Sequence, residues 1–192
     1  MQRREMKALA KQRFKLQYSV AVIGVLIALV LVSAVAGASV GLLVIFVFPI
    51  YVGEAKLFMK LHYEDQTDLK VVFDGFRQEF YLNNVLMLVL RAIFTFLWTL
   101  LLIIPGIIKH YAYAMVPFIL ADEAMSDDDH KNAITKSREL MNGHKFELFV
   151  IDLSFIGWFI LSALTFGILY VLYVQPYYMQ TRAIFYRKLT NY

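Results

Sequence analysis

The chain has 192 residues, of which 60% are hydrophobic and 18% charged, and its formal net charge is +4. Soluble domains are typically about 45–50% apolar and about 25% charged, so this composition predicts an integral membrane protein and gives no support to nucleic acid as a partner. Cysteine is absent, which excludes disulfides, thiolate metal sites and thiol nucleophiles.

Six apolar stretches follow one another along the chain, each too long for a strand of a globular protein. They cover residues 18–36, 39–57, 83–104, 106–121, 146–165 and 167–185. Short breaks containing Gly or Pro separate the two members of each consecutive pair, which favours hairpins over three very long helices. The sequence predicts one membrane domain over residues 1–192, an all-α polytopic protein with six transmembrane helices in three hairpins.

The N-terminus also imitates a cleavable signal peptide, with a basic start, an apolar run and the triplet Ala34-Val35-Ala36. Another apolar run follows the triplet where a polar mature domain would be expected. We therefore expect the first span to be retained.

The Lys and Arg residues predict the orientation. All 19 of them except Lys109 and Arg91 lie on the side of the N-terminal arm, the long connections and the C-terminal end. Basic residues concentrate on the cytoplasmic side of membrane proteins. The sequence predicts a multi-pass protein of the plasma membrane with both termini in the cytoplasm.

Three cytoplasmic segments carry apolar residues at helical spacing and are predicted to be amphipathic helices in the membrane interface. They are the N-terminal arm, residues 67–80 and residues 127–142. In the third segment, Ser126 is expected to cap the N-terminus and Gly143 the C-terminus.

These segments divide the chain into repeat-like units at about 1–60, 67–122 and 127–190. Each unit contains one proline in its second span: Pro49, Pro117 and Pro176. Because proline frees the carbonyl four residues earlier, each is expected to kink its helix.

The second half contains a series of motifs that resembles a known family. The motifs are LLIIPGIIK (101–109), PFILAD (117–122), LMNGHKFELF (140–149), LSFIGW (153–158) and Pro176-Tyr177. The chain resembles the bacterial integral membrane family called domain of unknown function 975 over about residues 75–190, although Phe146 stands where members often have Trp. The resemblance implies a polytopic bacterial membrane protein and implies no activity.

Arg91 lies well inside the third predicted span, and Asp152 lies well inside the fifth. Their positions place both about 10–12 Å from the cytoplasmic boundary, and unpaired charges at such depths are costly. We expect an ion pair between Arg91 and Asp152 that joins two hairpins. The alternatives are a polar path for a substrate or proton, or snorkelling of both side chains to the interface.

Other candidate residues have structural interpretations that compete with functional ones. Tyr170, Tyr173 and Tyr177 share one helix face, where packing is favoured over the lining of a cavity. His144 and Lys145 stand at the mouth of the fifth span, and we expect them to be interfacial residues at a helix start.

The sequence contains no nucleophile motif, phosphate loop or metal-ligand spacing, so we predict no catalytic activity, no cofactor and no metal. We predict a non-enzymatic protein that acts through protein or lipid contacts as a scaffold, regulator or accessory subunit. The alternative is a small transporter or carrier of an apolar or lipid-like molecule. The expected partners are anionic membrane lipids at the cytoplasmic face and an unidentified membrane or cytoplasmic protein, with no nucleic acid.

Overall fold

The computed structural model describes residues 3–35, 40–64, 67–76, 81–101 and 103–190, and every regular element in these ranges is a helix, as predicted. The helices are α1 (Arg3–Leu16), α2 (Tyr18–Val35), α3 (Val40–Tyr63), the 3₁₀ helix η1 (Leu69–Phe76), α4 (Tyr81–Leu101), α5 (Ile103–Ala112), α6 (Val116–Ala121), α7 (Asp127–Lys131), α8 (Ala133–Leu140), α9 (Lys145–Leu153), α10 (Ile156–Leu164), the π-helix η2 (Tyr170–Val174) and α11 (Gln175–Thr190).

Among the described residues, three helical segments are long and apolar enough to cross a membrane: Tyr81–Leu100, Ile104–Ala121 and Lys145–Leu164. A fourth crossing is added if α1 and α2, which meet at 90°, count as one bent span. Large apolar side chains such as Leu97 and Leu100 point outward from these segments. Soluble proteins rarely expose extended apolar surface, so this exterior is suited to lipid. Three to four helices meet these criteria, compared with the six spans predicted.

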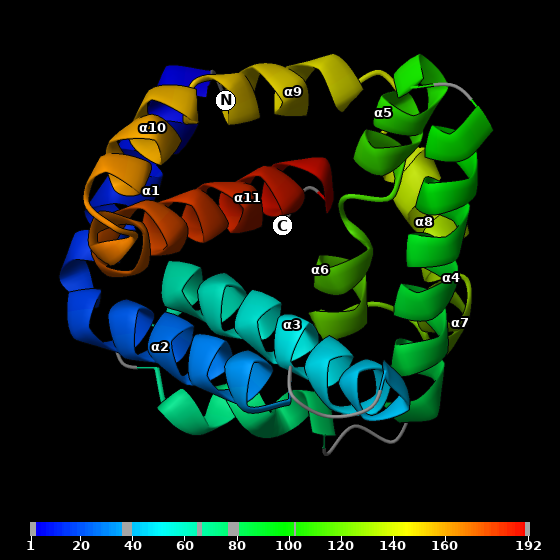
Figure 1. Cartoon of the computed structure of the whole chain (residues 1–192), viewed down its shortest axis with the longest axis horizontal. Coiled ribbons are helices and arrows are strands. Elements are labelled where there is room, and N and C mark those ends of the chain that lie inside the picture. Colours follow the sequence, from blue (N-terminus) through cyan, green and yellow to red (C-terminus); the bar gives the residue numbers. More distant parts are fainter. Residues whose placement is uncertain (1–2, 36–39, 65–66, 77–80, 102, 191–192) are drawn as a thin grey trace.

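The C-terminal helix α11 lies inside a frame formed by the other helices (Figure 1). Its buried residues are Pro176, Tyr177, Gln180, Thr181, Ala183, Ile184, Phe185 and Tyr186. The helices α1 and α3 both pack along it. Because protein surrounds α11, this helix tolerates polar and charged residues that a lipid-facing helix could not accommodate.

The apolar face of the N-terminal arm packs on protein. Met6, Ala10 and Phe14 of α1 are fully buried, and the helix lies against α11. The arm has one apolar face. That face packs on the helical core of the protein, whereas we expected it to lie in the lipid boundary.

Residues 69–76 form a 3₁₀ helix, which corrects the predicted amphipathic α-helix; residues 77–80 lie outside the described ranges. Val71, Val72 and Gly75 are buried and Phe73 is exposed. Residues three apart eclipse one another in a 3₁₀ helix, so Val72 and Gly75 share one side. The helix packs against α3, and this tertiary contact overrides the sequence period.

Two glycines allow this close packing. A Cβ at Gly53 of α3 would collide with the backbone carbonyl of Val72, and a Cβ at Gly75 would collide with the carbonyl of Pro49. Only glycine lets the two backbones approach so closely.

The N-cap predicted for the 127–142 segment is confirmed, but the C-cap of α8 is Met141, two residues before the predicted Gly143. The Ser126 hydroxyl accepts a hydrogen bond from the backbone N–H of Asp129 at 3.2 Å, and Gly143 has a φ of +79° after α8. The segment is divided into α7 and α8, and Ala133, Ser137 and Met141 are buried.

The three prolines have different effects. Pro49 lies within α3. Pro117 begins a new helix, α6, and the carbonyl of Tyr113 accepts a hydrogen bond from Val116 N at 3.3 Å. Pro176 directly follows the π-helix η2, in which Gln175 N bonds to Tyr170 O. Prolines 117 and 176 therefore mark a helix break and a π-helix, respectively, where simple kinks were expected.

Candidate functional site

A cavity of about 560 Å³ opens between α3, α4, α5, α6 and α11. Its apolar wall includes Phe48, Leu88, Phe96, Phe118 and Met179. Its polar lining consists of Tyr51, Glu54, Arg91, Thr95, Thr99, His110, Gln175 and Arg182. Most binding sites for small molecules likewise combine apolar walls with a few placed polar groups.

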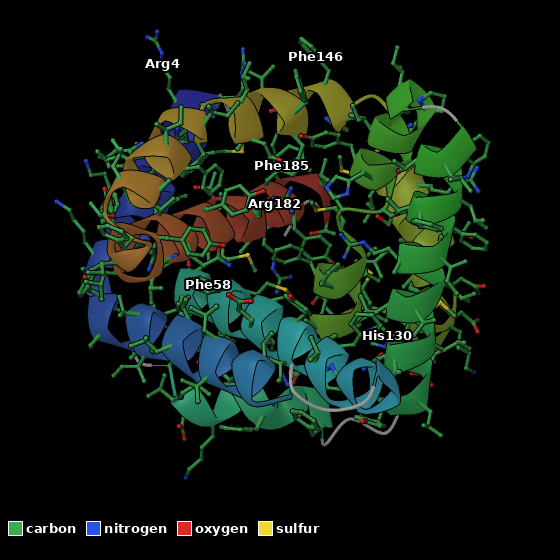
Figure 2. All side chains as sticks on the ribbon, in the orientation of Figure 1. Arg4, Phe58, His130, Phe146, Arg182 and Phe185 are labelled. Atoms are coloured by element: carbon green, nitrogen blue, oxygen red, sulfur yellow. The ribbon has the colours of Figure 1, made fainter. Side chains whose placement is uncertain are left out.

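Arg91 and Asp152 do not form the expected ion pair. Asp152 Oδ2 lies 2.8 Å from Nη2 of Arg182, and the side chains of both residues are largely buried. Arg182 points from α11 into the interior of the frame (Figure 2). Because α11 runs through the centre of the fold, its arginine reaches Asp152 at the end of α9.

Arg91 lines the cavity near Arg182, from the middle of α4. Among the described residues, no carboxylate lies within 4.0 Å of its guanidinium. Arg91 therefore faces the cavity, and Asp152, the carboxylate expected to pair with it, is paired with Arg182.

Glu54 is a buried carboxylate on α3, with 4% of its surface exposed. Gln175 Nε2 donates to its Oε1 at 3.3 Å, and the Tyr170 hydroxyl donates to Gln175 Oε1 at 2.7 Å. No cationic side chain of the described residues forms an ion pair with Glu54. The tyrosine hydroxyl fixes the orientation of the Gln175 amide so that its N–H faces the carboxylate.

A second hollow of about 120 Å³ lies on the α2 side of this group and has apolar walls that include Val25 and Ile50. Tyr51, Glu54 and Gln175 line both hollows. These three residues therefore form a polar partition between two largely apolar spaces.

His110 also lines the large cavity, while its neighbour Lys109 lies over the Trp98 ring, 4.6 Å from the centroid. The close packing of α4 on α5, where a Cβ on Gly106 would come within 2.6 Å of Thr99, holds His110 next to the cavity.

The tyrosine face of the last span is mostly packed against other helices. Tyr177 donates to the backbone carbonyl of Lys7 at 3.3 Å, and the Tyr173 ring lies 5.3 Å from the Trp158 ring and 5.6 Å from the Phe14 ring. Tyr170 lines the smaller hollow. None of the three lines the large cavity.

His144 and Lys145 lie where α9 begins. Nδ1 of His144 is 3.3 Å from Oε2 of Glu147, whose Oε1 accepts a hydrogen bond from Lys188 at 2.5 Å. Lys145 is the first residue of the helix. These contacts tie the start of α9 to the C-terminal end of α11.

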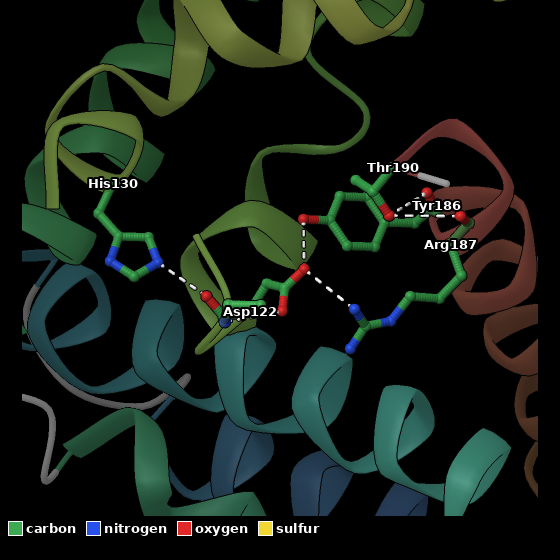
Figure 3. A network of polar contacts seen from close by, with 6 residues as sticks. Asp122, His130, Tyr186, Arg187 and Thr190 are labelled. Carbon is green, nitrogen blue, oxygen red and sulfur yellow. Dashed lines mark hydrogen bonds and ion pairs between the residues drawn. The ribbon is translucent and has the colours of Figure 1, made fainter. Parts of the chain in front are cut away.

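A separate polar network joins α6 to α11 (Figure 3). Asp122 is 2% exposed, and its Oδ2 accepts hydrogen bonds from the Tyr186 hydroxyl at 2.9 Å and from Arg187 at 3.2 Å. Nε2 of His130 lies 3.0 Å from the backbone carbonyl of Asp122. Because Asp122 directly follows α6 and both Tyr186 and Arg187 belong to α11, the network holds α6 and α11 together.

Sequence reasoning missed Glu54 and Gln175 and treated Arg182 as a cytoplasmic charge. For Glu54 a signal was present, since it is an acidic residue within the apolar stretch 39–57. The role of Arg182 had no local signal because it depends on the burial of α11. No group of three or more His, Asp or Glu residues in the described ranges could hold a metal ion.

Together these features define an all-helical protein with three to four helices apolar enough to cross a membrane, wrapped around a charged cavity. Residues 99–192 match the family described as "Protein of unknown function (DUF975)", which confirms for this part of the chain the family suggested by its motifs. The matched residues include Asp152 and Arg182, while Glu54 and Arg91 precede them. No curated protein and no solved structure matches the chain.

Proposed function

We propose that the chain is a non-enzymatic integral membrane protein that acts by binding, and that its central cavity takes a lipid-like molecule. The observation that carries this proposal is the cavity of about 560 Å³ with mainly apolar walls and a few charged groups. This volume lies within the range of about 300–1,000 Å³ that is common for small-molecule sites.

The cavity favours the second of the two functions that the sequence left open, the binding of a lipid-like molecule, over action through surface contacts alone. A transporter of polar solutes needs several polar groups near the membrane midplane, and the sequence offers chiefly Arg91, Asp152, a few Ser and Thr residues and the tyrosines. The gathering of Glu54, Arg91 and Arg182 at one cavity supports the binding of an amphiphile over action through surface contacts alone.

Exposed charges support surface contacts as the second candidate. Arg3, Arg4 and Lys11 of α1 are exposed, as are Asp127 and Asp128 of α7. Basic residues close to a membrane attract anionic lipids by about 1 kcal/mol each. The basic arm would bind such lipids, and the acidic start of α7 would meet a protein partner.

The proposal includes the finer topology, with six crossings in three hairpins and both termini in the cytoplasm of the cell. The charge asymmetry supports this orientation. The packing of α2 on α3 and of α4 on α5 is compatible with hairpins. The polar helix α11 could cross within a protein environment because other helices surround it.

The test is lipid binding by the purified protein with the cavity filled. Ala92 lines the cavity and is exposed, so Ala92→Trp should occupy the space without disturbing the core. Ala163→Trp, at an exposed position of α10 outside the cavity lining, is the matched control. We expect mass spectrometry to find a co-purifying lipid with the wild type and with the control, and much less of it with Ala92→Trp.

Two results would contradict lipid binding in the cavity. One is equal lipid retention by Ala92→Trp and Ala163→Trp. The other is the absence of any co-purifying lipid together with a protein partner that is lost when Asp127 and Asp128 are changed to Lys.

A further inference from the structure

Two charged side chains of opposite sign line the cavity, and neither has an ion-pair partner among the described residues. Arg91 approaches from α4 and Glu54 from α3. The other cavity charge, Arg182, is already paired with Asp152. Burying an unpaired charge is unfavourable, so both Arg91 and Glu54 would gain from a counter-charge supplied by a ligand.

We infer that the cavity binds a zwitterionic amphiphile, whose oxyanion lies at Arg91 and whose ammonium group lies at Glu54. The inference rests on the proposed binding of a lipid-like molecule and names the chemistry of its head. An amino-phospholipid with an ethanolamine-type head belongs to this class.

The positive end of the site is built from more than Arg91. Arg182 and His110 line the same cavity as Arg91 and add two basic side chains to this end of the site. An oxyanion placed among these groups would accept charge-assisted hydrogen bonds from a guanidinium, the geometry in which arginine recognises phosphate and carboxylate.

The negative end is Glu54, oriented by Gln175. The Gln175 amide donates to Oε1 of Glu54, and no described residue donates to Oε2. An ammonium group has three donors and no acceptor, so it suits this free carboxylate oxygen. Tyr51, one turn before Glu54 on α3, lines the same cavity.

Ligands with a single charge fit less well. A purely anionic head would satisfy Arg91 and place a like charge near Glu54, while a purely cationic head would do the reverse near Arg91. A quaternary ammonium has no N–H to donate to Glu54. The apolar wall of Phe48, Leu88 and Phe118 accommodates the chain of the amphiphile.

The test compares three single-chain probes with the purified protein in nanodiscs: lysophosphatidylethanolamine, lysophosphatidylglycerol and lysophosphatidylcholine. For the wild type we expect lysophosphatidylethanolamine to bind at least about tenfold more tightly than either other probe, since one hydrogen bond to a charged group is worth that much. Glu54→Gln should abolish this preference and keep the binding of lysophosphatidylglycerol.

Arg91→Gln should weaken lysophosphatidylethanolamine and lysophosphatidylglycerol by similar factors, and Arg91→Lys should restore part of the binding. Lys109→Gln, which removes a cation outside the cavity, should change nothing. Thermal unfolding of every variant confirms folding. If Glu54→Gln fails to fold, Glu54→Asp, which keeps the carboxylate, replaces it. A Glu54→Asp protein that still prefers lysophosphatidylethanolamine supports the assignment, and one that loses this preference while it still binds lysophosphatidylglycerol counts against it.

Equal binding of the three probes, unchanged by Glu54→Gln, would overturn the zwitterion and leave the binding of an amphiphile intact. Free phosphoethanolamine separates the two ideas further. If it bound as tightly as lysophosphatidylethanolamine and depended on Arg91 and Glu54, the charge assignment would stand and the lipid-like ligand would be wrong. Absence of binding by all probes would overturn both.

Discussion

The guanidinium of Arg182 donates to the carboxylate of Asp152 across 2.8 Å and joins α11 to the end of α9. The same guanidinium lies over the ring of Tyr178, with its central carbon 4.8 Å from the ring centroid. Arg182 is therefore already neutralised by Asp152 at the cavity. Arg91, the other arginine of the described cavity lining, is available to pair with a ligand.

We predict that this ion pair stabilises the fold only as a pair. Asp152→Ala or Arg182→Ala leaves one largely buried charge without its partner, and each should lower the free energy of unfolding by up to about 3–5 kcal/mol. The double variant should lose less than the sum of the two. Thermal unfolding in detergent measures the effect, with Arg91→Ala expected to cost less than Arg182→Ala. Strictly additive losses would show that the two side chains do not interact.

The hydrogen bond from the Tyr186 hydroxyl to the buried carboxylate of Asp122 should stabilise the fold. Tyr186→Phe removes a hydrogen bond to a charged, 2% exposed acceptor and should lower stability by about 1.5–3 kcal/mol. Tyr18→Phe removes a hydroxyl from an exposed residue and is the control. Equal unfolding temperatures for the two variants would count against a stabilising role for this network.

Two glycines should be intolerant of a methyl group because backbone lies directly against them. Gly53→Ala and Gly75→Ala each place a Cβ against a carbonyl in the contact between α3 and η1, and overpacking of this kind typically costs about 1–3 kcal/mol. Gly157→Ala is the matched control, since nothing lies within 4 Å of its Cβ position. The measurement is thermal unfolding, and a Gly53→Ala protein as stable as the control would disprove the close packing.

The cap of α7 should make stability sensitive to acid. Ser126→Ala should cost about 0.5–2 kcal/mol, and Ser126→Thr should retain most of the cap. Partial burial raises the pKa of Asp129, but hydrogen bonds from Ser126 and Lys136 outweigh it and hold that pKa below its ordinary value. A lowered carboxyl pKa contributes stability above its unfolded value, about 3.9, which is lost as the pH falls through the folded value. The acid-induced loss, followed by unfolding at stepwise lower pH, should be smaller in Ser126→Ala; an identical profile would refute this coupling.

The proposed orientation can be tested by labelling with an impermeant thiol reagent, since the chain has no cysteine of its own. Cysteines at Lys109 and Thr165 should react on intact cells, and cysteines at Asp128 and Asn191 should react only after lysis. The reverse pattern would invert the topology. Labelling of Asp128 from outside, with Asn191 protected, would rule out three hairpins.

The helical class and several local features of the chain follow from its sequence alone. Ser126 caps the start of α7 through a hydrogen bond within one turn, and such contacts are encoded by neighbouring residues. The break at Gly167 was visible for the same reason. Pro117 and Pro176 were expected to kink their helices, but a proline alone does not distinguish a kink from a new helix or a π-helix.

Tertiary structure decided which charges meet. Arg91 was expected to pair with Asp152 because the two residues lie at equal depth in straight, parallel spans. The structure instead has helix breaks between α5 and α6 and between α9 and α10. The central position of α11 brings Arg182 to Asp152 across 30 residues of sequence, whereas Arg91 and Glu54 remain at the cavity. Hydropathy reports how apolar a segment is over a short window, and it carries no information on whether lipid or other helices will surround that segment, which is what fixes the partner of a buried charge.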